Sequence, residues 1–114
     1  MIFQEFKKEK LNIICLQETY LTGKNIECLD REWTGDVFSS PGTCHSKGLV
    51  ILLCKNHQYK NVKIVHQSER ILAISFIENN EKIILLNVYA PYNVTEKIVF
   101  FGSVSDILEK NHQK

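Results

Sequence analysis

Long, nearly continuous apolar runs occur at four places in this chain. They occur at residues 11–16, 48–54, 70–77 and 82–89, and polar or turn-forming residues bound each of them. Continuous rather than alternating hydrophobicity is typical of strands that are buried on both faces. Residues 62–66 instead alternate apolar and polar side chains, as a half-exposed edge strand does. The pattern predicts a sheet whose central strands are covered on both sides.

Shorter signals complete the strand pattern. Residues 36–40 predict one more strand, which Pro41 and Gly42 end. The polar tetrad at 78–81 separates two apolar runs and predicts a hairpin. Between the first two strands, residues 20–33 predict a loop with a short helical piece at 26–33.

Two helices are expected at the ends of the chain. Apolar Ile2, Phe3 and Phe6 oppose a group of lysines, which indicates an amphipathic helix. Near the other end, Asn93 with Glu96 three residues later resembles an N-terminal cap. The positions expected to form the apolar face of the helix that follows are Ile98, Phe101, Val104 and Leu108.

The order of elements is helix, strand, loop, about four strands and helix. It predicts an α/β (α+β) fold, a layered sandwich with a mixed, mostly antiparallel sheet and flanking helices. No strand precedes the opening helix, and a buried sheet of this kind needs another sheet to cover it. We therefore expect residues 1–114 to be the N-terminal half of such a domain, with its first strand and C-terminal half missing, and self-association through the uncovered sheet.

Composition excludes several classes of protein. The 114 residues carry a formal net charge of +1, so the strongly basic balance of many nucleic-acid binders is missing. There is no signal-peptide core and no run near the roughly 18 apolar residues that a membrane span requires. The four cysteines form no Cys-x-x-Cys pair, so we expect no disulfide partner. We expect an intracellular protein, nuclear or cytoplasmic.

Polar side chains follow two of the buried strands. Glu18 comes after the run at 11–16, and Tyr89 ends the run at 82–89. A carboxylate at a strand end is placed to coordinate Mg²⁺, which prefers oxygen ligands. A tyrosine hydroxyl there is placed to donate a hydrogen bond to a phosphate oxygen. Taken alone, each residue is more often an ordinary strand-end side chain.

Four segments taken together carry more information. In order they read IICLQETYL from Ile13, SKGLVILL from Ser46, RILAISF from Arg70 and ILLNVYAPYN from Ile84. They resemble the endonuclease/exonuclease/phosphatase superfamily, and most of all the apurinic-type endonuclease domain of LINE-type retrotransposons. LQET and NVYAP are the specific parts of this resemblance, which extends from about Leu11 to Phe101.

The resemblance implies a metal-dependent phosphodiesterase that nicks DNA in retrotransposition. It implies that Glu18 holds the catalytic Mg²⁺ and that Tyr89 contacts the scissile phosphate. Arg70 matches an arginine near the nucleic-acid face. Asn93 matches a substrate-binding asparagine, although Tyr92 here separates it from Pro91, where the family reads Tyr-Ala-Pro-Asn.

The departures from the family pattern are as important as the matches. These residues contain no Gly-Asp-x-Asn segment and no Ser-Asp-His segment. Mg²⁺ wants near-octahedral oxygen coordination, so Glu18 by itself makes a weak or incomplete site. We expect a fragment that is inactive alone. Two alternatives stay open: a DNA-repair nuclease or phosphatase of the same superfamily, and a non-catalytic binding protein built on a nuclease half-fold.

Overall fold

The computed structural model describes residues 13–17, 33–40 and 48–112. The helix predicted at the start of the chain and Glu18 lie outside these ranges. So does the helical piece expected at 26–33, except for Trp33, which is buried and not helical.

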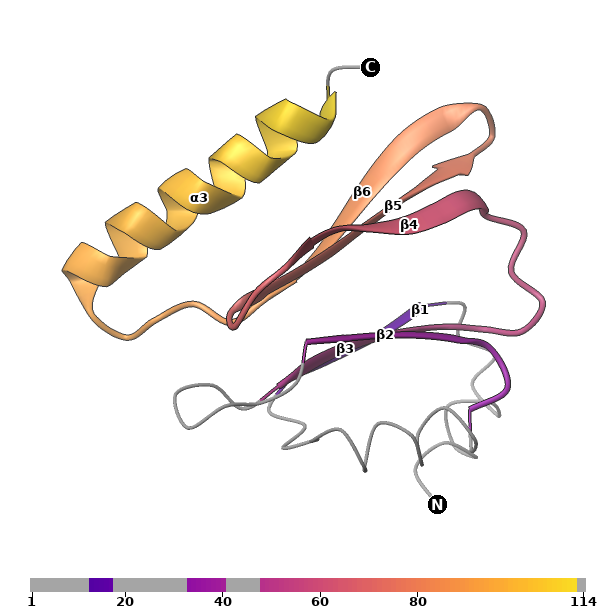
Figure 1. Cartoon of the computed structure of the whole chain (residues 1–114), viewed down its shortest axis with the longest axis horizontal. Coiled ribbons are helices and arrows are strands. Elements are labelled where there is room, and N and C mark those ends of the chain that lie inside the picture. Colours follow the sequence, from indigo (N-terminus) through magenta and orange to yellow (C-terminus); the bar gives the residue numbers. More distant parts are fainter. Residues whose placement is uncertain (1–12, 18–32, 41–47, 113–114) are drawn as a thin grey trace.

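Six strands and one helix are described (Figure 1). The strands are β1 (Ile13–Gln17), β2 (Asp36–Ser40), β3 (Leu49–Leu53), β4 (Lys60–Gln67), β5 (Ile71–Glu78) and β6 (Glu81–Val88). The helix is α3 (Val94–His112). They form two three-stranded antiparallel sheets with orders β1-β3-β2 and β4-β5-β6. The coarse prediction of a mixed α/β chain with antiparallel strands is confirmed.

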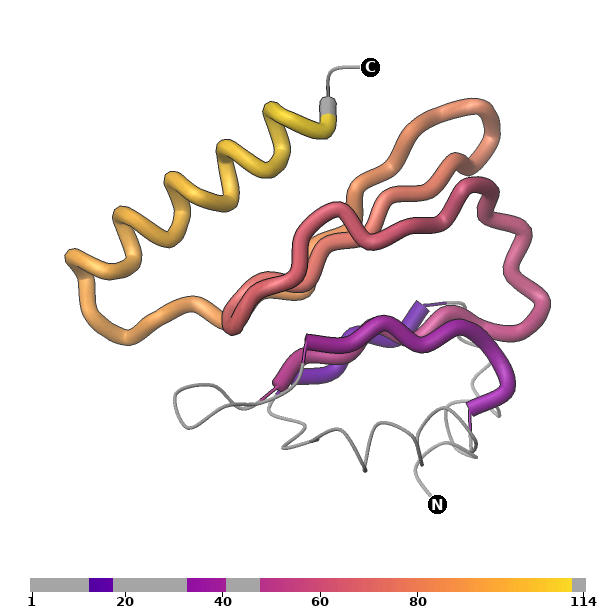
Figure 2. Tube along the Cα trace, in the orientation of Figure 1, coloured from indigo at the N-terminus to yellow at the C-terminus, as the bar shows by residue number. Residues whose placement is uncertain are grey.

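The two sheets lie face to face, as the tube in Figure 2 shows. Alternate residues of the central strands form the core between them: Leu49, Ile51 and Leu53 from β3, and Leu72, Ile74 and Phe76 from β5. Successive residues of a strand point to opposite faces, so these alternate residues share the inner face of their sheet. Each of them is buried there by the other sheet. The inner faces of these two sheets therefore cover one another.

The outer faces of the sheets are apolar too, which explains the continuous apolar runs. On the β1-β3-β2 sheet, Val50 and Leu52 pack with Ile14 and Trp33. On the other sheet, the outer residues of β5 meet α3. Every residue of β3 is buried, as predicted from its sequence.

The prediction that the first strand is buried on both faces was wrong. Of β1, only Ile14 is buried, and Cys15 is exposed. The physical reason is its place in the sheet, because among the described strands β1 pairs with β3 alone and so lies at the edge. An apolar run predicts a strand, but it does not predict which neighbours that strand has.

The predicted hairpin and edge strand are confirmed. Asn79 and Asn80 connect β5 to β6 with φ angles of 53° and 65°, and asparagine tolerates this left-handed region well. Pairing runs without a shift from Ile71↔Val88 to Glu78↔Glu81. By contrast, the pairing of β4 with β5 shifts register twice, and such bulges twist an edge strand away from further pairing.

Helix α3 begins as predicted, but of the four positions predicted to form its apolar face only Val104 packs on the sheet. The Asn93 side-chain oxygen accepts a hydrogen bond from the Glu96 backbone N–H at 3.1 Å, so Asn93 is the cap. Phe100, Val104 and Ile107 pack on the sheet, whereas Ile98, Phe101 and Leu108 are exposed. The spacing of apolar residues in the sequence is compatible with either set facing the sheet. Only the packing of the helix on the sheet shows which set is buried.

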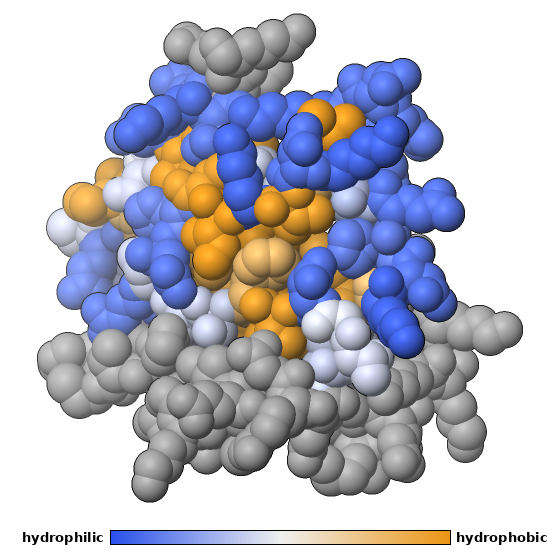
Figure 3. All heavy atoms as spheres, turned by 45° about the vertical axis from the view of Figure 1, so that its right-hand side comes forward, coloured by the Kyte–Doolittle hydropathy of each residue, from blue (hydrophilic) through white to orange (hydrophobic). Residues whose placement is uncertain are grey.

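Apolar surface also remains visible outside the core. On the face in Figure 3, hydrophobic residues gather in the middle and hydrophilic ones border them. No helix of the described segments is long and apolar enough to cross a membrane. Cys15 is a free cysteine and is exposed.

Candidate functional site

The ends of β1 and β6 lie together, although they are about seventy residues apart in the chain. Gln17 Nε2 donates to Asn87 Oδ1 at 3.3 Å and also to the Val88 carbonyl. Asn87 Nδ2 donates to the Leu16 carbonyl at 2.9 Å and to the Val50 carbonyl at 3.0 Å. This end of the sandwich therefore joins the two sequence segments that carry the candidate chemistry.

Asn87 is 4% exposed, and this buried position matters energetically. A buried amide left without partners costs about 1–3 kcal/mol, so its hydrogen bonds are needed. Both of its N–H donors are used, and its carbonyl oxygen accepts from Gln17. The sequence pattern had marked the strand end as polar, but the role of Asn87 was missed because its partners lie on another sheet.

Arg70 and Tyr89 form the second part of the site. They flank the first pair of the β5–β6 ladder, and the Tyr89 N–H donates to the Arg70 carbonyl at 2.8 Å. The Arg70 guanidinium donates to the Tyr89 carbonyl at 3.3 Å and lies 5.5 Å from the centroid of the Tyr89 ring. A cation within about 6 Å of an aromatic ring is attracted to its face. The structure thus brings together two predicted site residues.

A hollow of about 540 Å³ opens beside Arg70, between the start of β5 and the first turn of α3. Arg70, Thr95 and Phe100 contribute to its lining, and Glu69 and Glu96 place negative charge there. Asn93 is not part of this lining; its side-chain oxygen is used in capping the helix. The structure gives Asn93 a structural role, and a contact with substrate remains a prediction.

A larger hollow lies elsewhere in the described chain. Its volume is about 790 Å³, and it is lined by residues 56–60 and 77–80. The β5–β6 turn is at this end, whereas Arg70 and Tyr89 are at the opposite end of the same two strands. Size alone is therefore a poor guide to the site, and we place the candidate site where the polar strand ends meet.

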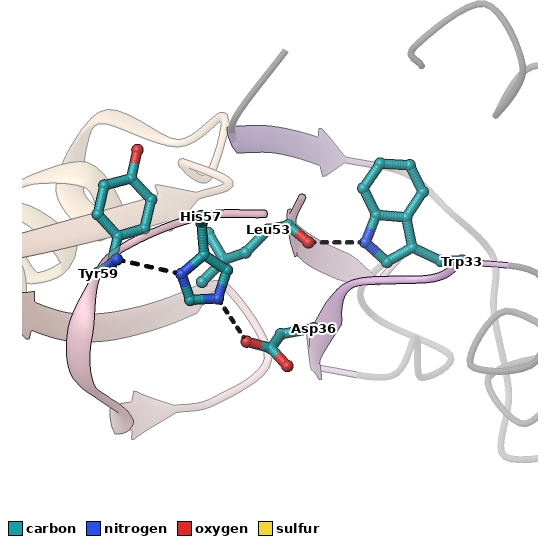
Figure 4. A network of polar contacts seen from close by, with 5 residues as sticks. All are labelled: Trp33, Asp36, Leu53, His57 and Tyr59. Atoms are coloured by element: carbon teal, nitrogen blue, oxygen red, sulfur yellow. Dashed lines mark hydrogen bonds and ion pairs between the residues drawn. The ribbon is translucent and has the colours of Figure 1, made fainter. Parts of the chain in front are cut away.

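His57 and Asp36 form a network near that second hollow (Figure 4). His57 Nδ1 accepts from the Tyr59 backbone N–H at 3.2 Å, so the proton resides on Nε2, which lies 2.8 Å from Asp36 Oδ2. Both ring nitrogens are therefore engaged in hydrogen bonds with groups of this chain. This pair ties the start of β2 to the chain leading into β4, which is a structural role.

Trp33 adds a second tie in the same region (Figure 4). Its indole N–H donates to the Leu53 carbonyl at 2.9 Å. A Cβ on Gly35 would lie 1.9 Å from that same oxygen, so only glycine fits here. The sequence contained no signal for these contacts.

The groups that could bind a metal ion do not cluster among the described residues. Within residues 13–17, 33–40 and 48–112, no three His, Cys, Asp or Glu side chains gather in a way that could hold a metal ion. Where the ends of β1 and β6 meet, the side-chain amides of Gln17 and Asn87 bind each other. These residues do not by themselves fit a Mg²⁺ site. The predicted ligand, Glu18, lies outside the described residues.

Neither the models of protein families nor the curated proteins contain a match to this chain.

Proposed function

We propose that this chain carries the glutamate and tyrosine part of a Mg²⁺-dependent phosphodiesterase site that nicks DNA, of the kind used in retrotransposition. The fold we propose for it is half of the α/β sandwich of the endonuclease/exonuclease/phosphatase superfamily. Glu18 would hold the metal, and Tyr89 and Arg70 would contact the DNA backbone. Because these 114 residues contain no Gly-Asp-x-Asn or Ser-Asp-His segment, we propose that they do not cut DNA alone.

One observation carries most of the support for this proposal. The contact of Gln17 with Asn87 places the end of β1 beside the end of β6. Glu18 follows Gln17 directly, and consecutive Cα atoms are only about 3.8 Å apart. Tyr89 likewise follows Asn87 by two residues. A carboxylate and a phenol delivered to one end of a sandwich suit a reaction that depends on positioning and on stabilising charge.

The proposal can be tested with the chain as it is. Its backbone amide NMR spectrum would be followed while a short DNA duplex is added, first with EDTA and then with Mg²⁺. We expect the amides of Arg70, Tyr89 and Gln17 to shift with DNA, and that of Gln17 to shift further with Mg²⁺ in the wild type but not in Glu18→Gln. If DNA leaves the Arg70 and Tyr89 amides unmoved, the proposed role in DNA binding is wrong.

A nicking assay on supercoiled plasmid tests the remaining claim. We expect no nicking from a sample whose circular dichroism shows it to be folded. Nicking that disappears both with EDTA and in Glu18→Ala would support the nuclease chemistry but contradict inactivity of the chain alone. Tyr89→Phe is the matched variant, because it removes only the hydroxyl group.

A second candidate, a non-catalytic binding protein, is favoured by one feature of α3. Val94, Ile98, Phe101 and Leu108 are 72%, 71%, 53% and 42% exposed, and their spacing places them along one side of the helix. Apolar surface of this kind often marks a contact with another molecule. Sedimentation equilibrium of the wild type and of Ile98→Glu tests this candidate. Self-association of the wild type that is lost in Ile98→Glu would support a binding role. A wild type that is monomeric at all concentrations would oppose it.

A further inference from the structure

Asn87 joins three strands with one side chain. Its two N–H groups reach the carbonyls of Leu16 on β1 and Val50 on β3, and these two residues are directly opposed in the sheet ladder. The amide of Asn87 itself comes from β6, in the other sheet. Packing of apolar side chains alone would not require an amide at this position, since a leucine in place of Asn87 would have a similar volume.

The sequence of β1 explains why a polar tie is useful there. Ile13, Ile14, Cys15 and Leu16 are all apolar, so a shift of the strand along β3 would still place apolar side chains on both faces. The register of a strand is strongly specified only where one face differs from the other. Among the described strands, β1 also has a single neighbour to hold it.

We infer that Asn87 is a positioning residue that sets the register of β1 and thereby fixes the place of Gln17, the end of that strand, relative to Tyr89. This inference rests on the proposed function, because it concerns the spacing of the two strand ends that would contact DNA. Asn87 acts through hydrogen bonds to Leu16 and Val50, and Gln17 reinforces it by donating to Asn87 Oδ1 and to the Val88 carbonyl.

The experiment compares three variants by amide NMR with a short DNA duplex. Asn87→Leu removes the tie while keeping a similar volume, and Gln17→Leu removes only the reinforcing contacts of an exposed residue. Ile74→Val is the matched control, since it weakens the core between the sheets without touching the tie. Cross-strand NOEs between Cys15 and Ile51, which are opposed in the wild type, report the register.

In the wild type and in Ile74→Val, we expect the amides of Gln17 and Tyr89 to shift together as DNA is added. In Asn87→Leu the NOEs between Cys15 and Ile51 should be lost. The shift at Gln17 should also be lost, while Arg70 and Tyr89 still respond. Gln17→Leu should show the same losses in part, and it serves as the test if Asn87→Leu does not fold.

Two results would overturn the inference, and they differ from failure of the proposed function. If Asn87→Leu and Gln17→Leu are folded and keep the NOEs between Cys15 and Ile51, Asn87 does not set the register of β1. If the register changes but Gln17 and Tyr89 still respond together, the register does not position the site. If the wild type shows no response to DNA at Arg70 and Tyr89, the proposed function itself is wrong, and the positioning role falls with it.

Discussion

The guanidinium of Arg70 lies 5.5 Å from the centroid of the Tyr89 ring and also donates a hydrogen bond to the carbonyl of the same tyrosine. One side chain thus holds both the ring and the backbone of its partner at the end of β6. The arrangement leaves the tyrosine with little freedom to reorient. A residue that must present a hydroxyl group to a phosphate benefits from this, because less ordering is needed when the ligand binds.

Arg70→Lys should weaken this arrangement although the charge is kept. A lysine ammonium lacks the planar fork that lets arginine stack on a ring and donate a hydrogen bond at once. We expect a stability loss of about 0.5–1 kcal/mol, the usual size of a partly exposed cation–π contact. Urea unfolding followed by circular dichroism measures it. An unchanged midpoint, with an unchanged NMR spectrum at Tyr89, would show that the contact contributes nothing.

Asn93→Ala should destabilise α3 at its first turn. The side-chain oxygen of Asn93 accepts from the Glu96 N–H, and loss of such a cap costs about 0.5–2 kcal/mol. Thermal unfolding gives the change, with Tyr92→Ala as control because Tyr92 is 98% exposed. Equal melting temperatures for the two variants would contradict the capping role. If Asn93 also contacts DNA, the Asn93→Ala protein will in addition bind the duplex more weakly.

The adjacent phenylalanines should respond very differently to truncation. Phe100 is 8% exposed against the sheet, whereas Phe101 is 53% exposed. Phe100→Ala should cost about 3–5 kcal/mol because it leaves a cavity between helix and sheet. Phe101→Ala should cost about 1 kcal/mol, mainly through the lost edge contact between the rings. The denaturant midpoints of the two variants measure these losses. A larger loss for Phe101→Ala than for Phe100→Ala would mean that the helix packs on the sheet through the face that carries Phe101.

Gly102→Ala should stabilise the protein. Gly102 lies inside α3, and a Cβ added there would meet no atom within 4 Å. Glycine in a helix interior is less favourable than alanine by about 1 kcal/mol, so the gain should approach that value. The melting temperature reports it, and Ser103→Ala on the next residue is a useful comparison. Destabilisation would indicate that something packs on this side of the helix.

Tyr59 should make stability depend on pH in alkaline solution. Burial, then the negative charge of Glu78, raises the pKa of its phenol above the ordinary value of 10.0. The unfolded chain then loses this proton at a lower pH than the folded chain does. The contribution of Tyr59 to the free energy of unfolding is therefore fully present below about pH 10, and it is lost as the pH rises above that value. Urea midpoints across this range should fall more steeply for wild type than for Tyr59→Phe, and parallel curves would contradict the shift.

Much of the fold was accessible from the sequence, because local chemistry determined it. The apolar runs predicted β3, β5 and β6 and their hairpin, and the alternation at 62–66 predicted β4 as an edge strand. The spacing of Asn93 and Glu96 predicted the start of α3. Each of these features depends on residues that are close together in the chain, so their pattern alone carries the information.

The tertiary structure decided the rest, because those features depend on partners far apart in the chain. It made β1 an exposed edge strand, faced one sheet with the other, and chose Phe100 over Phe101 as the buried ring. It also brought Gln17 to Asn87, and Arg70 to Tyr89. The sequence by itself determined which segments become strands and which residues could carry chemistry. Only the packing of the sheets determined which of those residues meet, since a buried amide must find its hydrogen-bond partners wherever the fold places them.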